Sequence, residues 1–250
     1  ALGALLAAKP FYANVVRLPD GTPVGQVVAD SSTKALAMAL VIVGWIVSLC
    51  LHEWAHAYTA YRSGDLSVVD KGYLTLDPRK YTDPILSLVL PLVFLVIGGI
   101  GLPGGAVWID HGAIRSRHRE ALVSAAGPAV NLVFGAACLG LVEVLATDGP
   151  TALSSALAWL GWLQFLTAAL NLLPIPGLDG YGIIDPYLPR ELRASLWNAG
   201  RYGLFIVFFV VVFTPVGQGL FSLADRMVEA TGVDTLNVVI GQEIARPQLK

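Results

Sequence analysis

Residues 35–58 read ALAMALVIVGWIVSLCLHEWAHAY, an apolar run that ends in two histidines and a glutamate. A helix of this length and composition can span a bilayer. His52 and His56 are four positions apart, so on a helix both imidazoles project from one face and can bind one metal ion. Zinc held in this way lowers the pKa of a bound water, and the adjacent Glu53 can accept its proton. The stretch therefore predicts a metal-dependent hydrolytic site in a membrane helix.

The composition of the 250-residue chain is also typical of a membrane protein. Hydrophobic residues make up 55% of it and charged residues only 14%, well outside the averages of soluble domains. The net charge of −2 offers no basic surface, and no nucleic-acid-binding motif is found. We therefore expect a lipid bilayer as a partner and no nucleic acid. The N-terminus lacks the leading positive charge of a secretory signal, so no cleaved signal peptide is expected.

The apolar runs predict an all-α polytopic membrane protein with about four to six transmembrane segments. The first span is expected from an N-cap at Ser31–Thr33 to about Tyr61, and the others over residues 85–100, 121–145, 151–174 and 204–213. After the first span, Leu66–Val69 and Gly72–Leu76 favour short β-strands near the site. We divide the chain into an extramembrane or interfacial segment (1–34), a membrane-embedded domain (35–215) and an interfacial tail (216–250).

Two histidines need a third protein ligand, because catalytic zinc usually has three and leaves a position for water. Asp179 follows the fourth span, where two prolines and two glycines break the helix near membrane depth. A carboxylate at that depth needs a pair or a metal to offset its desolvation. Glu143, at the far end of the third span, is the other acidic candidate, although a solvated position suits it better. His111 and His118 lie in an arginine-rich loop and are expected to be solvated.

Bringing Asp179 to the histidines restricts the topology. If residues 85–100 crossed the bilayer fully, Asp179 would lie on the opposite side, so we predict a re-entrant or hairpin-like element between Pro84 and His118. Ten of the sixteen Lys and Arg residues then fall on the side of the metal site, which predicts that this side is cytoplasmic. These ten are Arg62, Lys71, Arg79, Lys80, Arg115, Arg117, Arg119, Arg190, Arg193 and Arg201.

Taken together, these motifs resemble the site-2 protease family of intramembrane zinc metalloproteases. His52–His56 matches the family's HExxH, Asn171–Gly180 matches its NxxPxPxLDG, and Gly127–Asn131 matches its GPxxN. Gly72–Pro78, followed by Thr82–Pro84, is similar to a compact bacterial subgroup without a PDZ or CBS domain. The resemblance covers roughly residues 36–180.

This resemblance implies specific roles for the matched residues. His52, His56 and Asp179 would bind zinc, and Glu53 would be the catalytic acid/base. Asn171 would clamp the substrate backbone, and the stretch around Val107 would offer a substrate-binding edge. Gly127, Pro128 and Asn131 are interpreted as packing or loop-bracing residues.

The expected activity is zinc-dependent hydrolysis of peptide bonds in membrane-spanning substrates, that is, regulated intramembrane proteolysis. We expect an integral protein of a bacterial cell membrane, with a transmembrane protein as substrate. A regulatory membrane protein and a homo-oligomer stay open as further partners, and the oxyanion donor stays open between His111 and Asn171. Two alternatives remain: a membrane zincin with a glutamate third ligand and a divalent-metal transporter. A non-catalytic scaffold agrees less well with the intact Glu53.

Overall fold

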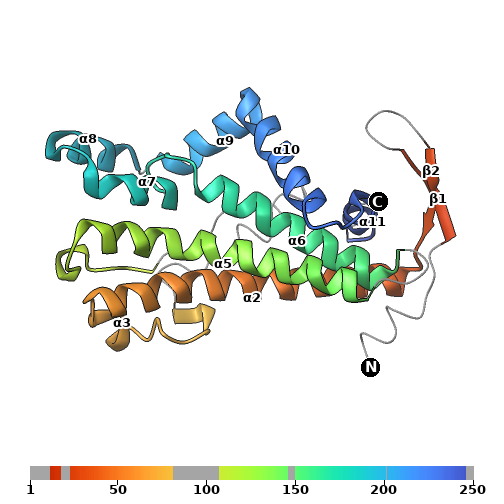
Figure 1. The fold of residues 1–250 in the computed structure, drawn as a ribbon, viewed down its shortest axis with the longest axis horizontal. Coiled ribbons are helices and arrows are strands. Elements are labelled where there is room, and N and C mark those ends of the chain that lie inside the picture. The colour runs from red at the N-terminus through yellow and green to blue at the C-terminus, as the bar shows by residue number, and fades with distance from the viewer. Residues whose placement is uncertain (1–11, 18–22, 81–106, 146–149, 201, 246–250) are drawn as a thin grey trace.

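Three long helices running side by side form the body of the protein (Figure 1). The computed structural model describes residues 12–17, 23–80, 107–145, 150–200 and 202–245. The three helices are α2 (Ser31–Ser63), α5 (Arg117–Val144) and α6 (Ala152–Asn171), and each is long and apolar enough to cross a membrane. Helices α2 and α6 run in one direction and α5 in the other, so the C-terminal ends of α2 and α6 point toward the same end of the bundle (Figure 1). The prediction of a mostly helical membrane protein is confirmed.

Side-chain caps set where these helices begin. The carboxylate of Asp30 accepts a hydrogen bond from the Thr33 amide at 2.7 Å, so the cap of α2 is Asp30 and not the predicted Ser31–Thr33. The hydroxyl of Ser116 caps α5, which starts four residues before the predicted position. Thr151, the first residue of the predicted span 151–174, caps α6. In each case a polar side chain satisfies an amide that the helix leaves without a partner.

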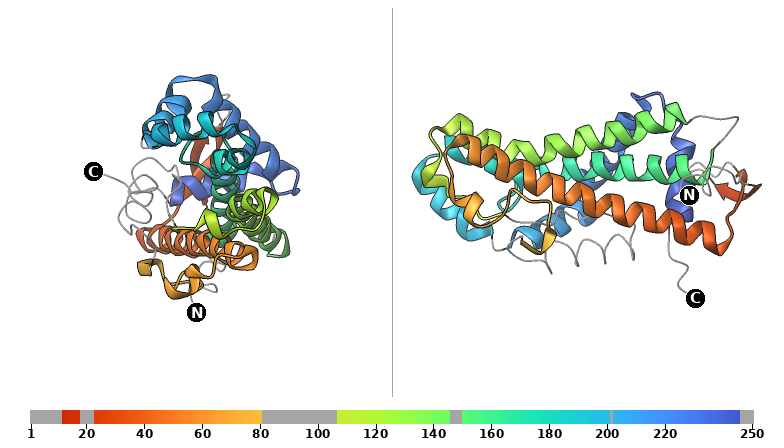
Figure 2. Two further views of the ribbon diagram at one scale, coloured as in Figure 1. Left: turned by 90° about the vertical axis from the view of Figure 1, so that its left-hand side faces the viewer. Right: turned by 90° about the horizontal axis from the view of Figure 1, so that it is seen from below.

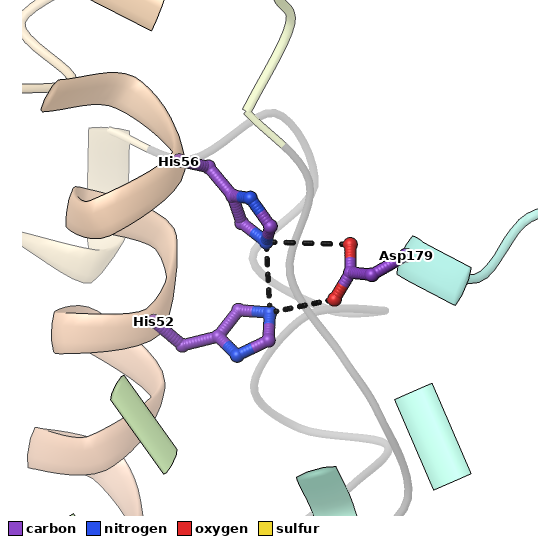
Figure 3. A group of neighbouring side chains, drawn as sticks. All are labelled: His52, His56 and Asp179. Atoms are coloured by element: carbon purple, nitrogen blue, oxygen red, sulfur yellow. Dashed lines mark hydrogen bonds and ion pairs between the residues drawn. The ribbon is translucent and has the colours of Figure 1, made fainter. Parts of the chain in front are cut away.

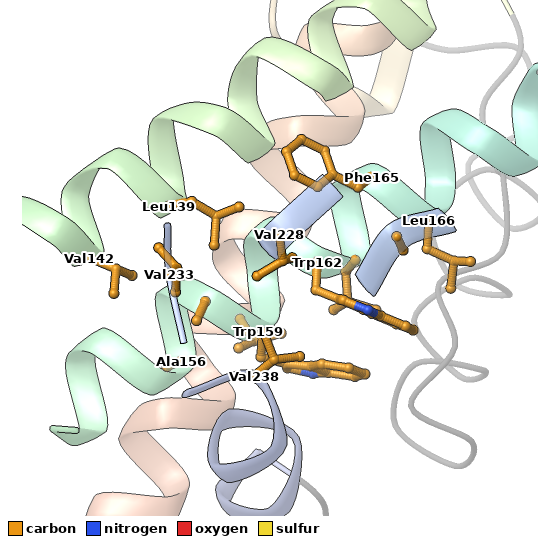
Figure 4. Close-up of a cluster of buried hydrophobic side chains, with 14 of the residues drawn as sticks. Leu139, Val142, Ala156, Trp159, Trp162, Phe165, Leu166, Val228, Val233 and Val238 are labelled. Carbon is orange, nitrogen blue, oxygen red and sulfur yellow. The ribbon is translucent and has the colours of Figure 1, made fainter. Parts of the chain in front are cut away.

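Helix α6 lies in the interior of the bundle, where it contacts α2, α5, α10 (Pro215–Glu229) and α11 (Thr235–Ile244). Figure 4 shows Trp159 and Trp162 of α6, whose rings stack with centroids 4.9 Å apart, among buried side chains of the neighbouring helices. Helices α10 and α11 fall in the segment 216–250, for which the sequence predicts an interfacial tail. Several of their apolar residues belong to the core, and the domain boundary at 215 stays a prediction.

Helix α9 (Gly203–Phe213) corresponds to the last predicted span, 204–213. It meets α10 at a bend of 80°, so the described residues contain three candidate spans, or four if this bent pair counts as one. The exposed phenylalanines of α9, Phe205, Phe209 and Phe213 among them, suit a surface in contact with lipid. The predicted span 85–100 lies outside the described residues.

The strands predicted between Leu66 and Leu76 are wrong. The chain there forms the short helix α3 (Ser67–Asp70), then turns, and then the 3-10 helix η1 (Pro78–Lys80). The cause is Asp65, whose carboxylate accepts hydrogen bonds from the amide and the hydroxyl of Ser67 and so favours a helical turn. The strands that the structure does contain, β1 (Tyr12–Arg17) and β2 (Pro23–Val28), pair antiparallel near the start of α2 (Figure 2).

Asp65 also ties the segment that enters α5 to the end of α2. Its carboxylate accepts a hydrogen bond from the Asp110 amide at 2.8 Å, and the Lys71 ammonium donates to the Trp108 carbonyl at 2.9 Å. Burial opposes ionisation of Asp65, but hydrogen bonds from Ser67 and Asp110 hold the pKa of its carboxyl below the usual value. Residues 65–80 and the start of the next described range therefore both lie at the C-terminal end of α2. The predicted re-entrant element falls mainly on residues 81–106, outside the described part of the chain.

Beyond α6 the chain turns back over the same end of the bundle. A loop leads from Asn171 to α7 (Asp179–Ile184), which is followed by the 3-10 helix η4 (Asp185–Tyr187) and by α8 (Arg190–Gly200). Gly177 has φ of +100°, a backbone conformation that favours glycine. This turn directs the start of α7 toward α2 and α5.

Candidate metal centre

Three side chains from two distant segments converge at one end of the bundle (Figure 3). His52 and His56 come from α2, and Asp179 is the first residue of α7. The two Nε2 atoms are 3.0 Å apart, and each lies 3.3 Å from one carboxylate oxygen of Asp179. The histidines are buried and the Asp179 side chain is 21% exposed. The three predicted ligands therefore lie together. Helix α6 runs toward the same end of the bundle as α2, and this brings Asp179 to the histidines.

These distances fit a zinc ion. Tetrahedral zinc with bonds of about 2.0–2.1 Å has neighbouring donor atoms roughly 3.3 Å apart. The three donors have nearly this spacing already, and two imidazole nitrogens with one carboxylate oxygen form a common catalytic donor set. Among the described residues, this is the group of histidine and acidic side chains that could hold a metal ion.

Helix α5 accepts a hydrogen bond from the Nδ1 atom of each histidine. The Nδ1 atom of His52 lies 2.5 Å from the Asn131 side-chain oxygen, and Nδ1 of His56 lies 2.7 Å from the Val123 carbonyl oxygen. Because both partners are acceptors, each Nδ1 carries a proton, and in the neutral imidazole each Nε2 then keeps its lone pair. Both lone pairs therefore point toward Asp179, as metal binding requires.

Two glycines allow α5 and α7 to pack closely at the three donor side chains. A methyl group at Gly127 would lie 2.3 Å from Nε2 of His56 and 2.5 Å from Nε2 of His52, in the space between the ligands. A methyl group at Gly180 would lie 2.2 Å from the Leu172 carbonyl oxygen. The first glycine leaves room at the donor atoms, and the second lets Asp179 fold back against the end of α6.

Glu53 is buried next to the three donors. It is 3% exposed, interacts electrostatically with His52, His56 and Asp179, and forms a hydrogen bond with the backbone of Val107. A carboxylate in this position can exchange a proton with a molecule bound at the donors.

The other candidates of the sequence analysis are not part of this group of three side chains. Glu143 is in the last turn of α5, 16 residues beyond Gly127 (143 minus 127). His111 pairs with Glu120 at 3.1 Å, and His118 lies 2.8 Å from the Tyr187 hydroxyl. Asn171 is buried at the end of α6. The structure brings Asp179 and not Glu143 to the histidines, and His111 is engaged elsewhere.

Comparison with known proteins shows relatives along most of the chain. It is 44% identical over 207 residues to the zinc metalloprotease Rip2 of Mycolicibacterium smegmatis, which covers 83% of this chain and 80% of the relative. It is 43% identical over 224 residues to Rip2 of Mycobacterium tuberculosis, covering 87% and 85%. The zinc metalloprotease YwhC of Bacillus subtilis is 34% identical over 188 residues, covering 72% and 83%.

The chain belongs to the site-2 protease family of zinc metalloproteases. The predictions of a metallopeptidase and of zinc as its cofactor are thereby confirmed. No family model and no solved structure matches the chain.

The structure gives this site-2 protease two site residues whose roles the sequence analysis did not predict. Gly127 and Asn131 are part of the quoted GPxxN motif, but they were interpreted as packing or bracing residues. Gly127 instead faces the donor nitrogens, and Asn131 contacts His52. The helical spacing of the motif could have indicated a shared face, since these residues are four positions apart.

We predict that Gly127→Ala removes zinc from the protease without removing a ligand, because its methyl group occupies the space between the two Nε2 atoms. Zinc content of the purified protein, measured by mass spectrometry of the metal, checks this. Gly140→Ala on the same helix is the control, since a methyl group there meets no atom within 4 Å. Equal zinc in the two variants would contradict the prediction.

Proposed function

We propose that the protein is an intramembrane zinc metalloendopeptidase that cleaves membrane-spanning substrates. His52, His56 and Asp179 are the zinc ligands of this proposal, and Glu53 is its catalytic acid/base. The observation that carries the proposal is the convergence of these donors beside a buried carboxylate, in a bundle whose long helices can cross a membrane. Such a site acts on peptide bonds that lie within or next to the bilayer.

The chemistry follows from the arrangement of the side chains. Bound zinc supplies a Lewis acid for the scissile carbonyl and lowers the pKa of a bound water. Glu53 accepts the proton of the attacking water and transfers it to the leaving amine nitrogen. Because the carboxylate is buried with the donors, this transfer takes place within the site.

We propose that substrate binds along residues 107–110. The first of these, Val107, contacts Glu53 through its backbone. Lys71 and Asp65 bind the Trp108 carbonyl and the Asp110 amide, and in an extended conformation these two groups share one edge of the segment. The Val107 carbonyl and the Ile109 backbone groups then face the opposite edge, where the Val107 amide already binds Glu53. A substrate helix must unwind before cleavage, and an added strand on this edge would bind its exposed amides.

Asn171 is proposed as a second substrate contact, because its amide can both donate and accept hydrogen bonds. It is 4% exposed at the C-terminal end of α6, eight residues before Asp179. Contact with a substrate backbone therefore requires a shift of the loop that joins α6 to α7.

The two alternatives are supported less well. A glutamate third ligand would have to be Glu143, which is in the last turn of α5. A metal transporter needs polar residues along its spans. The described spans do bury Ser48, Asn131 and Gln164, but these neutral groups are hydrogen bonded to one another and include no carboxylate. They do not form a path of cation ligands.

We place the protein in a bacterial cell membrane, with the metal site toward the cytoplasm. The arginines at the start of α5 and in α8 support this, because they lie at the site end of the bundle. A transmembrane protein is the proposed substrate, and a regulatory membrane protein or a second copy of the chain is a further proposed partner.

We expect Asp179→Ala to lose zinc, whereas Glu143→Ala keeps it. Zinc affinity should fall by at least the ~10–100-fold that is typical when a group hydrogen bonded to a metal ligand is removed. Titration with a competing chelator measures both affinities. Zinc binding lost in Glu143→Ala and kept in Asp179→Ala would favour the alternative zincin.

Glu53→Gln should retain zinc and lose peptide-bond cleavage by about 10²–10⁴-fold, because the amide cannot accept the proton. The assay reconstitutes the protein in liposomes with single-span substrates and follows cleavage on gels. Cleavage at the wild-type rate by a zinc-loaded Glu53→Gln protein would refute the assigned mechanism.

The proposed orientation predicts different labelling at the two ends of α5. A cysteine at Arg117 should react with a membrane-impermeant maleimide only after the cells are permeabilised, and a cysteine at Glu143 should react in intact cells. The native Cys50 and Cys138 are buried, so the wild-type protein is the background control. The reverse pattern would place the site on the outer side.

A further inference from the structure

Three neutral polar side chains are buried where α2, α5 and α6 pack together. They are Ser48, one turn before His52 on α2, Asn131 on α5 and Gln164 on α6. Each is 3% exposed or less. Only Asn131 lies in a motif matched to the family, so the other two have no assigned role.

Hydrogen bonds connect these side chains to the metal centre in one continuous path. The Ser48 hydroxyl donates to Oε1 of Gln164. The Asn131 amide nitrogen donates to the same oxygen at 2.8 Å, and its oxygen lies 2.5 Å from Nδ1 of His52. The path starts on α2, passes through α6 and α5, and returns to α2 one turn further on.

The orientation of each amide decides the tautomer of His52. An asparagine side chain is an acceptor at one end and a donor at the other. Because Gln164 accepts from the nitrogen of Asn131, the oxygen of Asn131 faces His52 and Nδ1 must carry the proton. If Asn131 were reversed, its donor would face Nδ1, the proton would move to Nε2, and the nitrogen that faces Asp179 would lose its lone pair.

Packing alone does not account for Gln164. Within the described residues its Nε2 group is fully buried and has no hydrogen-bond partner, a state that costs free energy in an apolar bundle. An apolar side chain of the same length would avoid that cost. The feature that Gln164 adds is the acceptor oxygen, which receives both hydrogen bonds.

We propose that Gln164 and Ser48 are positioning residues for His52. Through Asn131 they hold the imidazole in the tautomer and orientation that present Nε2 to the metal, although neither touches the ion. This inference rests on the proposed ligand set, in which His52 binds zinc. Groups that accept a hydrogen bond from a metal-bound histidine commonly act this way, and their loss weakens metal binding by ~10–100-fold.

The test compares two substitutions of Gln164 in the full chain, purified in detergent. Gln164→Met keeps the length of the side chain but removes the acceptor, and Gln164→Glu keeps an acceptor oxygen. We expect zinc affinity, measured by chelator competition, to fall by ~10–100-fold in Gln164→Met and to be largely restored in Gln164→Glu. The absorption spectrum of the cobalt(II)-substituted protein should change in Gln164→Met, because His52 no longer holds its position.

Thr167→Val provides the matched control. Thr167 is also buried on α6, but its hydroxyl donates to the Leu163 carbonyl of its own helix at 2.8 Å and lies outside the path. This variant should keep the wild-type zinc affinity and cobalt spectrum. The unfolding temperature of each metal-free variant shows whether a change in zinc affinity merely follows a loss of fold.

A double-mutant comparison separates this inference from the ligand proposal. Gln164→Met should have no further effect on zinc affinity when His52→Ala is already present. Wild-type zinc affinity in His52→Ala alone would refute the ligand set. Wild-type affinity and spectrum in Gln164→Met, or an equal loss with and without His52, would overturn the positioning role.

If Gln164→Met does not fold, Ser48→Ala provides the same test. Weaker zinc binding in Ser48→Ala would support the positioning role, and unchanged binding would overturn it.

Discussion

Most of the arrangement depends on two hydrogen bonds that helix α5 accepts from the histidines of α2. A buried imidazole needs a partner for its N–H, and in an apolar bundle that partner must be another part of the protein. The Asn131 side chain and the Val123 carbonyl supply it. These bonds set how α5 lies along α2. They also leave both Nε2 atoms directed at the place where the chain returns with Asp179.

Two kinds of feature could be predicted from the sequence: residues at a regular spacing within one helix, and charged side chains whose burial in a membrane has a high desolvation cost. The two histidines at i and i+4 follow directly from helix geometry. A carboxylate after a broken membrane helix needs a partner, which indicates Asp179. The requirement that Asp179 reach the histidines predicts that α5 and α6 run in opposite directions. The assignment of these residues as ligands stays a prediction that the geometry supports.

Other features could not be predicted, because they depend on contacts between distant segments or on competition between local interactions. Ser48 and Gln164 are 116 residues apart in the chain, and no periodic pattern relates them. The predicted strands after Gly64 failed for a different reason. Alternating apolar residues favour a strand, but the carboxylate of Asp65 binds the backbone and hydroxyl of Ser67 and stabilises a helical turn instead.

The separation of the ligands along the chain has a thermodynamic consequence. His56 and Asp179 are 123 positions apart (179 minus 56), so an ion bound to both closes a loop of more than a hundred residues. A site built from such distant ligands does not exist in the unfolded chain, so the ion binds the folded protein and stabilises it to an extent that depends on metal concentration. The centre would then act as a removable cross-link between α2 and α7. Binding of the ion and docking of α7 against α2 are therefore thermodynamically coupled.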